Sequence, residues 1–334
     1  MRLGRVVLVM TILTTVALSS HARASGLGST YVALGDSYTS GAGLSPYLTG
    51  STTCSRSPEA YPEDVARALA GPQLDFVACS GATISQIMRQ VHSASASLAN
   101  ASLVTLTAGG NDLSFSKLSL SCLGAVTSPS SDHVQYLPFS GGSTACANAV
   151  AGAARLLGAN VNPKTGAVSS PAAVTANVVS TPSPLEGRLI ALLQTVLQAS
   201  TSGNARAGAN VLVVEYPLLL THLTSHACLL SGSPLEIPGG VTLYPAFSSL
   251  VTRELIGVNS LLRRETAAVV RTLASAQPRL QLVDTSSFVP LNCRTGDSSD
   301  LNGVSVSTLR SGSTLHPTER GQALMATAVL RLVG

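Results

Sequence analysis

A serine that follows a short apolar run is the first residue of this chain to suggest chemistry. Tyr31–Leu34 is apolar and leads directly into Gly35-Asp36-Ser37, while His316 stands near the far end of the chain. A histidine has a pKa near neutrality, so it can take the proton of a serine hydroxyl and return it to a leaving group. The two residues together would support acyl transfer, with Ser37 as the nucleophile and His316 as the base.

Two further segments contain groups that could stabilise the negative charge formed during acyl transfer. They are Cys79-Ser80-Gly81-Ala82 and Gly109-Gly110-Asn111-Asp112. The backbone N–H groups of Ser37 and Gly81, with the side-chain amide of Asn111, could form an oxyanion hole. The glycines would let the backbone approach a substrate closely.

Each of these segments also has an ordinary structural explanation. Gly-Asp-Ser is more often a turn or a helix cap, and Gly-Gly-Asn-Asp is a good turn signal. What favours chemistry is their order and their position at the ends of successive apolar runs. His222 and His226 have the spacing of metal ligands on a helix, but no acidic or cysteine residue stands nearby, so we expect no metal site there.

The elements that must position these residues can be read from short apolar runs bounded by turn or polar residues, which are typical of buried parallel strands. The expected strands are 31–34, 74–78, 103–106, 211–214 and 280–283. Helices are expected from Pro62, across 255–273 and over 317–332. This alternation predicts a parallel sheet with helices on both faces, and ligands gather at the carboxyl ends of such strands.

The beginning of the chain is typical of a secretory signal peptide. Two arginines precede the apolar run Val6–Leu18, and Ala22-Arg23-Ala24 has the small-residue pattern of a cleavage site. We expect residues 1–24 to be removed and residues 25–334 to form a single secreted, extracellular domain without a transmembrane segment. Residues 122–183, rich in Ser, Gly and Pro, should be an inserted lid or decorated loop, with a breaker at 181–184.

The net charge of the chain gives no support for a nucleic-acid partner. The formal net charge of +4 falls to +1 when Arg2, Arg5 and Arg23 leave with the signal, so nothing favours a nucleic-acid partner. We expect a monomer that takes a small-molecule or lipid ester.

Six cysteines in an exported chain predict three disulfides, and six allow 15 pairings. Pairing neighbours in sequence closes the shortest loops and gives Cys54–Cys79, Cys122–Cys146 and Cys228–Cys293.

The four motif segments, ending with His316, stand in the order of the four blocks of the SGNH (GDSL) esterase/lipase family, which this chain resembles from Tyr31 to about Gly321. The resemblance implies a flavodoxin-like, three-layer α/β/α sandwich with a central parallel sheet. It also implies hydrolysis of carboxylic esters without a metal or organic cofactor, by the residues named above in the roles given there. The cysteines and the insert are most similar to the secreted actinobacterial lipase/esterase branch.

One position departs from the family pattern. Many members carry an aspartate three residues before the histidine, where this chain has Ser313. A histidine base still needs an acceptor that fixes its second N–H. We expect the main-chain carbonyl of Ser313 to orient His316, and Asp284 and Asp300 are the alternatives.

The leading functional hypothesis is an extracellular lipase or esterase that acts on lipid acyl esters through an acyl-enzyme at Ser37. A short-chain acetyl esterase acting on polysaccharide is the alternative, although the chain has no tryptophan on which sugar rings could stack. A non-catalytic binding protein on the same scaffold would not need all four site residues. The Gly-x-Ser-x-Gly elbow of α/β-hydrolases is absent from the sequence, which argues against that fold.

Overall fold

The structure is a computed structural model. It describes residues 30–127, 136–138, 142–169, 182–201, 208–221, 227–231, 233–237, 239–311 and 313–333. The predicted signal peptide, residues 1–24, lies outside this range, as do His222 and His226. No helix in the described part of the chain is long and apolar enough to cross a bilayer.

A five-stranded parallel sheet forms the centre of the fold, in the spatial order β2-β1-β3-β8-β13. Its strands are β1 (Thr30–Leu34), β2 (Gln73–Phe76), β3 (Ala101–Leu106), β8 (Asn210–Val214) and β13 (Leu280–Val283). All five strands expected from the apolar runs are present. The order is that of flavodoxin-like doubly wound folds, which confirms the predicted fold class.

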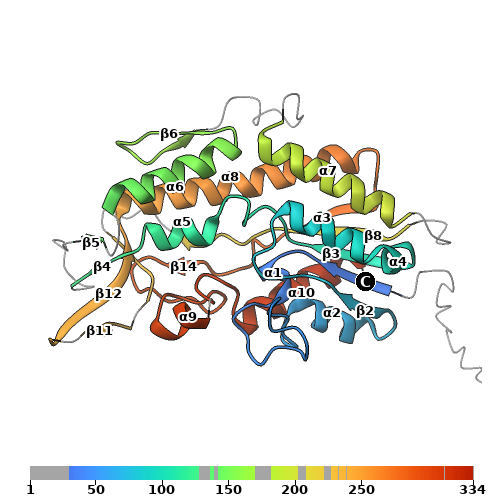
Figure 1. Cartoon of the computed structure of the whole chain (residues 1–334), viewed down its shortest axis with the longest axis horizontal. Helices are drawn as coiled ribbons and strands as arrows, with labels where there is room; N and C mark the ends of the chain where they lie inside the picture. Colours follow the sequence, from blue (N-terminus) through green and yellow to red (C-terminus); the bar gives the residue numbers. More distant parts are fainter. Residues whose placement is uncertain are drawn as a thin grey trace, which may run out of the picture.

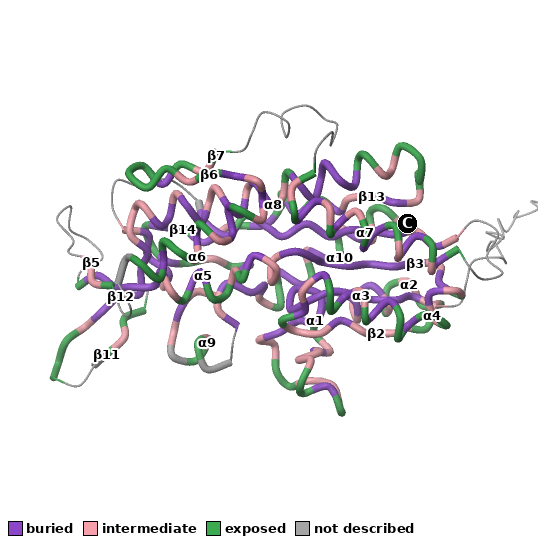
Figure 2. The backbone as a smooth tube through the Cα atoms, turned by 45° about the horizontal axis from the view of Figure 1, so that its top comes forward, coloured by how far each residue is buried: buried purple, intermediate pink, exposed green. Residues whose placement is uncertain are grey.

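Helices cover both faces of this sheet, as Figure 1 shows. On one face lie α2 (Tyr61–Leu69) and α10 (Glu319–Val333), which pack against each other. On the other lie α3 (Ile84–Ser93), α4 (Ser95–Ala99), α7 (Pro184–Ala199) and the long α8 (Ser249–Ala274). Figure 2 shows the central strands as buried between these layers. Residues 31–34 and 211–214 are buried without interruption, because helices remove both faces of the sheet from water.

A second, antiparallel sheet lies at the opposite end of the molecule from α2 and α4 (Figure 1). It consists of β10 (Cys228–Leu229), β12 (Val241–Phe247), β4 (Gly124–Val126) and β5 (Tyr136–Pro138), and β11 (Leu235–Ile237) pairs with β12. The remaining elements are α1 (Ser37–Ser40), α5 (Phe115–Ser121), β6 (Asn160–Val161), β7 (Val168–Ser169), β9 (Leu220–Thr221), β14 (Leu291–Asn292) and α9 (Val306–Ser311).

The segment 122–183 is more regular than its composition predicts. It contributes β4 and β5 to the second sheet and forms α6 (Gly142–Leu156), which packs against α5 and α8. At the end of the segment, where a breaker was expected at 181–184, the chain begins helix α7. The Ser183 hydroxyl accepts the Glu186 N–H at 3.1 Å and the Glu186 carboxylate accepts the Ser183 N–H at 2.8 Å, while Pro184 occupies the first helical position of α7. A reciprocal cap of this kind begins a helix.

Three disulfides join the cysteines in the sequential pairing. Cys54 is bonded to Cys79, Cys122 to Cys146 and Cys228 to Cys293. The first lies beside the serine turn, the second connects the end of α5 to α6, and the third connects β10 to the chain that follows β14.

Candidate active site

Ser37 lies at the carboxyl end of β1, where the chain turns into α1. Asp36 caps this turn, because its carboxylate accepts the N–H of Tyr38 at 3.0 Å. Gly35 has a φ of +126°, and a Cβ at this position would lie 2.7 Å from Thr39 Oγ1 and 2.8 Å from the carbonyl oxygen of Thr107. Only glycine fits both the dihedral angle and the space, so the sharp approach to Ser37 depends on it.

His316 faces Ser37 across the site, although 279 residues separate them in sequence. Its Nε2 lies 2.8 Å from Ser37 Oγ, and its Nδ1 lies 3.0 Å from the carbonyl oxygen of Thr314. A carbonyl can only accept, so Nδ1 must carry the proton and Nε2 is free to accept the serine O–H. This is the tautomer that a general base for Ser37 requires.

Burial sets the ionisation of His316. The side chain is buried, and desolvation lowers the pKa of the imidazole from its ordinary value of 6.5. The carbonyls of Thr314 and Ser313 oppose this shift by hydrogen bonding. The imidazole is therefore neutral at pH 7 and able to accept a proton.

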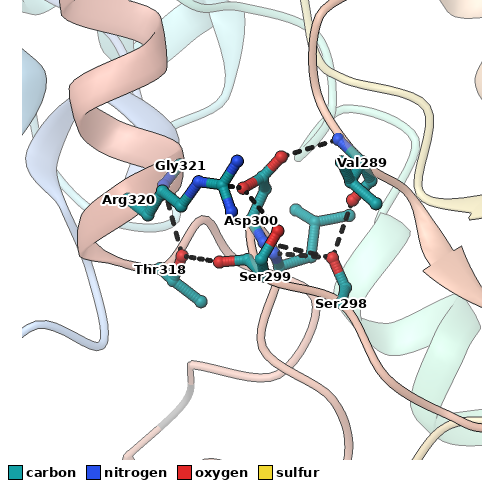
Figure 3. A network of polar contacts seen from close by, with 8 residues as sticks. Val289, Ser298, Ser299, Asp300, Thr318, Arg320 and Gly321 are labelled. Carbon is teal, nitrogen blue, oxygen red and sulfur yellow. Dashed lines mark hydrogen bonds and ion pairs between the residues drawn. The ribbon is translucent and has the colours of Figure 1, made fainter.

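The orienter of His316 is main-chain oxygen, as expected, but the 3.0 Å hydrogen bond is made by Thr314, one residue after Ser313. The carbonyl of Ser313 acts on the same ring and raises the pKa of His316. Asp284 is exposed and its carboxylate binds Ser286. Asp300 is fully buried and holds the Val289 N–H at 2.7 Å, as Figure 3 shows. Within the described part of the chain, the hydrogen bonds of the His316 ring go to Thr314 and Ser37 and not to either carboxylate.

The loop that carries His316 is held by a neighbouring segment of the chain. The carbonyl of His316 accepts the N–H of Asn302 at 2.9 Å, and the carbonyl of Asn302 accepts the N–H of Leu315 at 2.8 Å. Leu315 has a φ of +58°, which is uncommon for a leucine. The Tyr38 hydroxyl donates to its carbonyl at 2.6 Å, so the serine turn and the histidine loop are bonded directly to each other.

The three expected oxyanion donors lie on adjacent loops. Asn111 donates one amide N–H to the carbonyl of Ala82 at 3.1 Å, which connects it to the loop of Gly81 and leaves its second N–H for a ligand. The backbone N–H groups of Ser37 and Gly81 have no acceptor within the described part of the chain. Gly81 has a φ of +79° and open space where a Cβ would stand.

A pocket of about 140 Å³ opens beside Ser37, Asn111 and His316. Its walls are mostly apolar and include Phe115, Leu123, Leu219, Phe247, Leu262 and Leu315. Within 122–183, Leu123 is the one residue of the described part that lines this pocket. No cluster of three or more potential metal ligands occurs in the described part of the chain.

A family model described as the GDSL-like Lipase/Acylhydrolase family matches residues 33–324, which is most of the chain. The chain belongs to this family. The matched range begins just before Gly35 and includes the Ser37, Gly81, Asn111 and His316 segments whose geometry is described above.

Relatives of this GDSL family member include Streptomyces lipases. A lipase of Streptomyces rimosus is 39% identical over 92 residues, which are 28% of this chain and 34% of that protein. Lipase 1 of Streptomyces coelicolor is 36% identical over 109 residues, 33% of this chain and 40% of that protein. The aligned segments thus span well under half of each relative.

Solved structures match over nearly the whole chain. The phospholipase A1 from Streptomyces albidoflavus NA297 has 25% sequence identity and a TM-score of 0.57, with 92% of this chain and all of that chain covered. The extracellular lipase from Streptomyces rimosus has 22% identity and a TM-score of 0.59 at the same coverage. The two structures confirm the α/β sandwich.

The structure also brings residues to the GDSL site that sequence reasoning missed or set aside. Tyr38 and Tyr216 line the pocket, and their rings meet edge to face with centroids 5.0 Å apart. Thr314 supplies the hydrogen-bonded carbonyl. Asp36, expected to hold the serine turn, does so and also binds the Tyr216 hydroxyl. No spacing signal marks Tyr216, because only the fold places it beside a turn 180 residues earlier.

Proposed function

We propose that this chain is an extracellular serine hydrolase of carboxylic esters, with lipid acyl esters as its substrate class. The observation that carries the proposal is the 2.8 Å contact between Ser37 Oγ and His316 Nε2 in the lining of a mostly apolar pocket. A nucleophile and base within hydrogen-bond reach, with the base oriented by a third group, is the arrangement that acyl transfer needs.

The reaction would proceed through an acyl-enzyme. Ser37 Oγ attacks the ester carbonyl carbon while its proton passes to His316 Nε2, and the N–H groups of Ser37, Gly81 and Asn111 stabilise the oxyanion. His316 then gives the proton to the departing alkoxide as the carbon–oxygen bond breaks. Water attacks the acyl-enzyme with His316 as base, which releases the carboxylic acid and restores Ser37.

The apolar walls of the pocket favour an acyl chain over a sugar. Burial of methylene groups against such walls is worth about 0.8 kcal/mol each, which rewards a fatty chain and not a polar acetylated saccharide. The names of the relatives, lipase and phospholipase A1, are consistent with this class. Three disulfides and the extracellular lipase among the structural neighbours support secretion, and the family match over residues 33–324 supports a single domain. Residues 1–24 are the proposed signal peptide that is removed on export.

Hydrolysis of p-nitrophenyl esters from acetate to palmitate, by the protein without residues 1–24, tests the proposal. We expect the highest turnover on medium or long chains, and a loss of roughly 10⁴-fold or more in Ser37→Ala. Ser102→Ala, on β3 at the other end of the sheet, is the matched control and should keep full activity.

Each alternative has its own outcome. Activity confined to the acetate ester would favour the short-chain acetyl esterase. Absence of turnover, together with absence of Ser37 labelling by a fluorophosphonate, would favour a binding protein on the same scaffold. Turnover that survives in Ser37→Ala would refute the assignment of the nucleophile.

A further inference from the structure

Tyr216 lies where the serine turn meets the loop that carries Asn111. It follows β8, is buried, and packs its ring edge to face against Tyr38, the residue after the proposed nucleophile. Its hydroxyl reaches Asp36 on one side and Gly110 on the other. Two loops that must act on the same oxyanion are therefore bridged by one side chain.

The hydrogen bonds of this bridge have a single consistent direction. The Gly110 N–H donates to the Tyr216 oxygen at 3.1 Å, so the tyrosine O–H must donate onward to Asp36 Oδ2. The other oxygen of Asp36 accepts the Thr107 hydroxyl at 2.7 Å and the Tyr38 N–H at 3.0 Å. Asp36 is buried, so each of these donors compensates a carboxylate that has lost its water.

Packing adds to the hydrogen bonds. A Cβ built on Gly110 would lie 3.1 Å from the Cζ of Tyr216 and 3.2 Å from its hydroxyl oxygen, so the loop lies directly against the ring. Asn111 is the next residue, and the carbonyl of Ala82 holds its amide from the other side. The position of the Asn111 amide is thus determined by Ala82 at the side chain and by Tyr216 at the preceding backbone.

We propose that Tyr216 is a positioning residue for the oxyanion hole, which fixes the Asn111 amide relative to Ser37 by joining Gly110 to Asp36. The inference rests on the proposed function, in which Asn111 is an oxyanion donor. A donor must stand about 2.7–3.1 Å from the developing oxyanion, and a displacement of about 1 Å can cost about 10²-fold in rate. Loss of the bridge should therefore slow the chemical step while ester binding is largely kept.

Tyr216→Phe tests this directly, because it removes the hydroxyl and keeps the ring. We expect kcat on p-nitrophenyl butyrate to fall about 10- to 100-fold, with KM changed by less than about 3-fold. The pH midpoint of kcat/KM should stay where it is in the unmodified protein, since Tyr216 does not hydrogen bond His316. A rise in KM with unchanged kcat would overturn the proposal.

A double-mutant cycle with Asn111→Ala decides whether Tyr216 acts through Asn111. If it does, Tyr216→Phe costs almost nothing further once the amide is absent, so the double variant is as active as Asn111→Ala alone. If the fold-losses in kcat of the two single variants multiply in the double variant, the proposal is overturned. If Ser37→Ala remains active, the proposed function itself has failed, and this outcome is distinguishable because it does not involve Tyr216 or Asn111.

Two further variants separate positioning from folding. Tyr31→Phe is the matched control, because Tyr31, near the amino end of β1, is also fully buried and its hydroxyl bonds Thr105 on β3. The Tyr31→Phe variant should keep the kcat of the unmodified protein even if its melting temperature falls. Gly110→Ala pushes a methyl group against the Tyr216 ring at a residue without a positive φ. Alone, it should lower kcat. In the Asn111→Ala background it should have no further effect, as expected for Tyr216→Phe, so it tests the inference even if Tyr216→Phe fails to fold.

Discussion

The imidazole of His316 has carbonyl oxygens beside Nδ1 in place of the carboxylate found in a Ser-His-Asp triad. A carbonyl fixes the tautomer as well as a carboxylate does, because only acceptance of the Nδ1 proton is needed. It stabilises the imidazolium less, since it carries a partial charge only. Burial is therefore the dominant influence on the ring, with no negative partner among the residues that the structure describes, and it lowers the pKa of His316.

This lowered pKa gives a prediction for the dependence of activity on pH. The base must be neutral, so kcat/KM should rise with pH to a midpoint below 6.5 and be level at neutral pH. The same shift means that the unfolded chain takes up the proton first, so stability falls as pH drops from 6.5 towards the folded-state pKa. Initial rates on a soluble ester between about pH 4 and 9 provide the measurement. A midpoint at or above 6.5 would show that a negative group faces the ring.

At the scale of elements, the segment between β14 and α9 supports the loop that carries His316. Residues 300–302 run beside residues 315–318, with a bridge between Leu301 and Pro317 and a hydrogen bond from the Thr318 N–H to the Asp300 carbonyl. Figure 3 shows the Asp300 side chain at the centre, between Val289 and Arg320. Its buried carboxylate anchors the segment on which the histidine loop rests.

Asp300→Ala should therefore weaken both the fold and the catalysis. Loss of charge-assisted hydrogen bonds to a buried carboxylate typically costs about 1.5–3 kcal/mol, and the partly released histidine loop should lower kcat by about 10-fold. Asp297→Ala, an exposed aspartate in the same loop, should change stability by less than about 0.5 kcal/mol. Urea unfolding and initial rates of the two variants check this, and equal effects would refute the anchoring role of Asp300.

The elements differ in how well the sequence predicts them. The runs in β1 and β8 are visible because both their faces are covered, so no polar residue interrupts 31–34 or 211–214. The edge strand β2 is only partly buried and includes Asp75, so its run is a weaker signal. The start of α7 was misjudged, because Pro182 and Pro184 suggest a break while the Ser183–Glu186 pair that caps the helix is a less conspicuous signal. Strands of the second sheet such as β4 and β10 are two or three residues long and leave no periodic pattern.

Among the site residues, side-chain identity was predictable and backbone placement was not. Ser37 and His316 were expected to meet because they follow strands or precede a helix at one edge of a parallel sheet. Which carbonyl faces Nδ1 depends on dihedral angles such as the positive φ of Leu315, and these cannot be read from residue types. Tyr216 was missed because its role arises from contacts with Asp36 and Gly110, which are distant in sequence.

At the scale of the whole molecule, the pocket lies between the parallel sheet and the second sheet. Ser37 and Asn111 come from strand ends of the first, Phe247 ends β12 of the second, and Val304 comes from the loop before α9. Leu230, just after β10, accepts the Val304 N–H at 2.7 Å. The disulfide Cys228–Cys293 lies at this junction and joins Cys228, which pairs with Phe247 of β12, to the segment that leads towards Val304.

Removal of this disulfide, by Cys228→Ala with Cys293→Ala, should be the most destabilising of the three double replacements. It spans 65 residues against 25 for Cys54–Cys79 and 24 for Cys122–Cys146, and the chain-entropy relation gives about 4 kcal/mol for a loop of that length and about 3.5 kcal/mol for the shorter ones. Loosening of the pocket walls should also raise KM for long-chain esters more than for acetate. Guanidinium unfolding of the three double variants ranks the losses. A smaller loss for Cys228–Cys293 than for the other pairs would mean that packing of the second sheet, and not the covalent connection, holds this junction together.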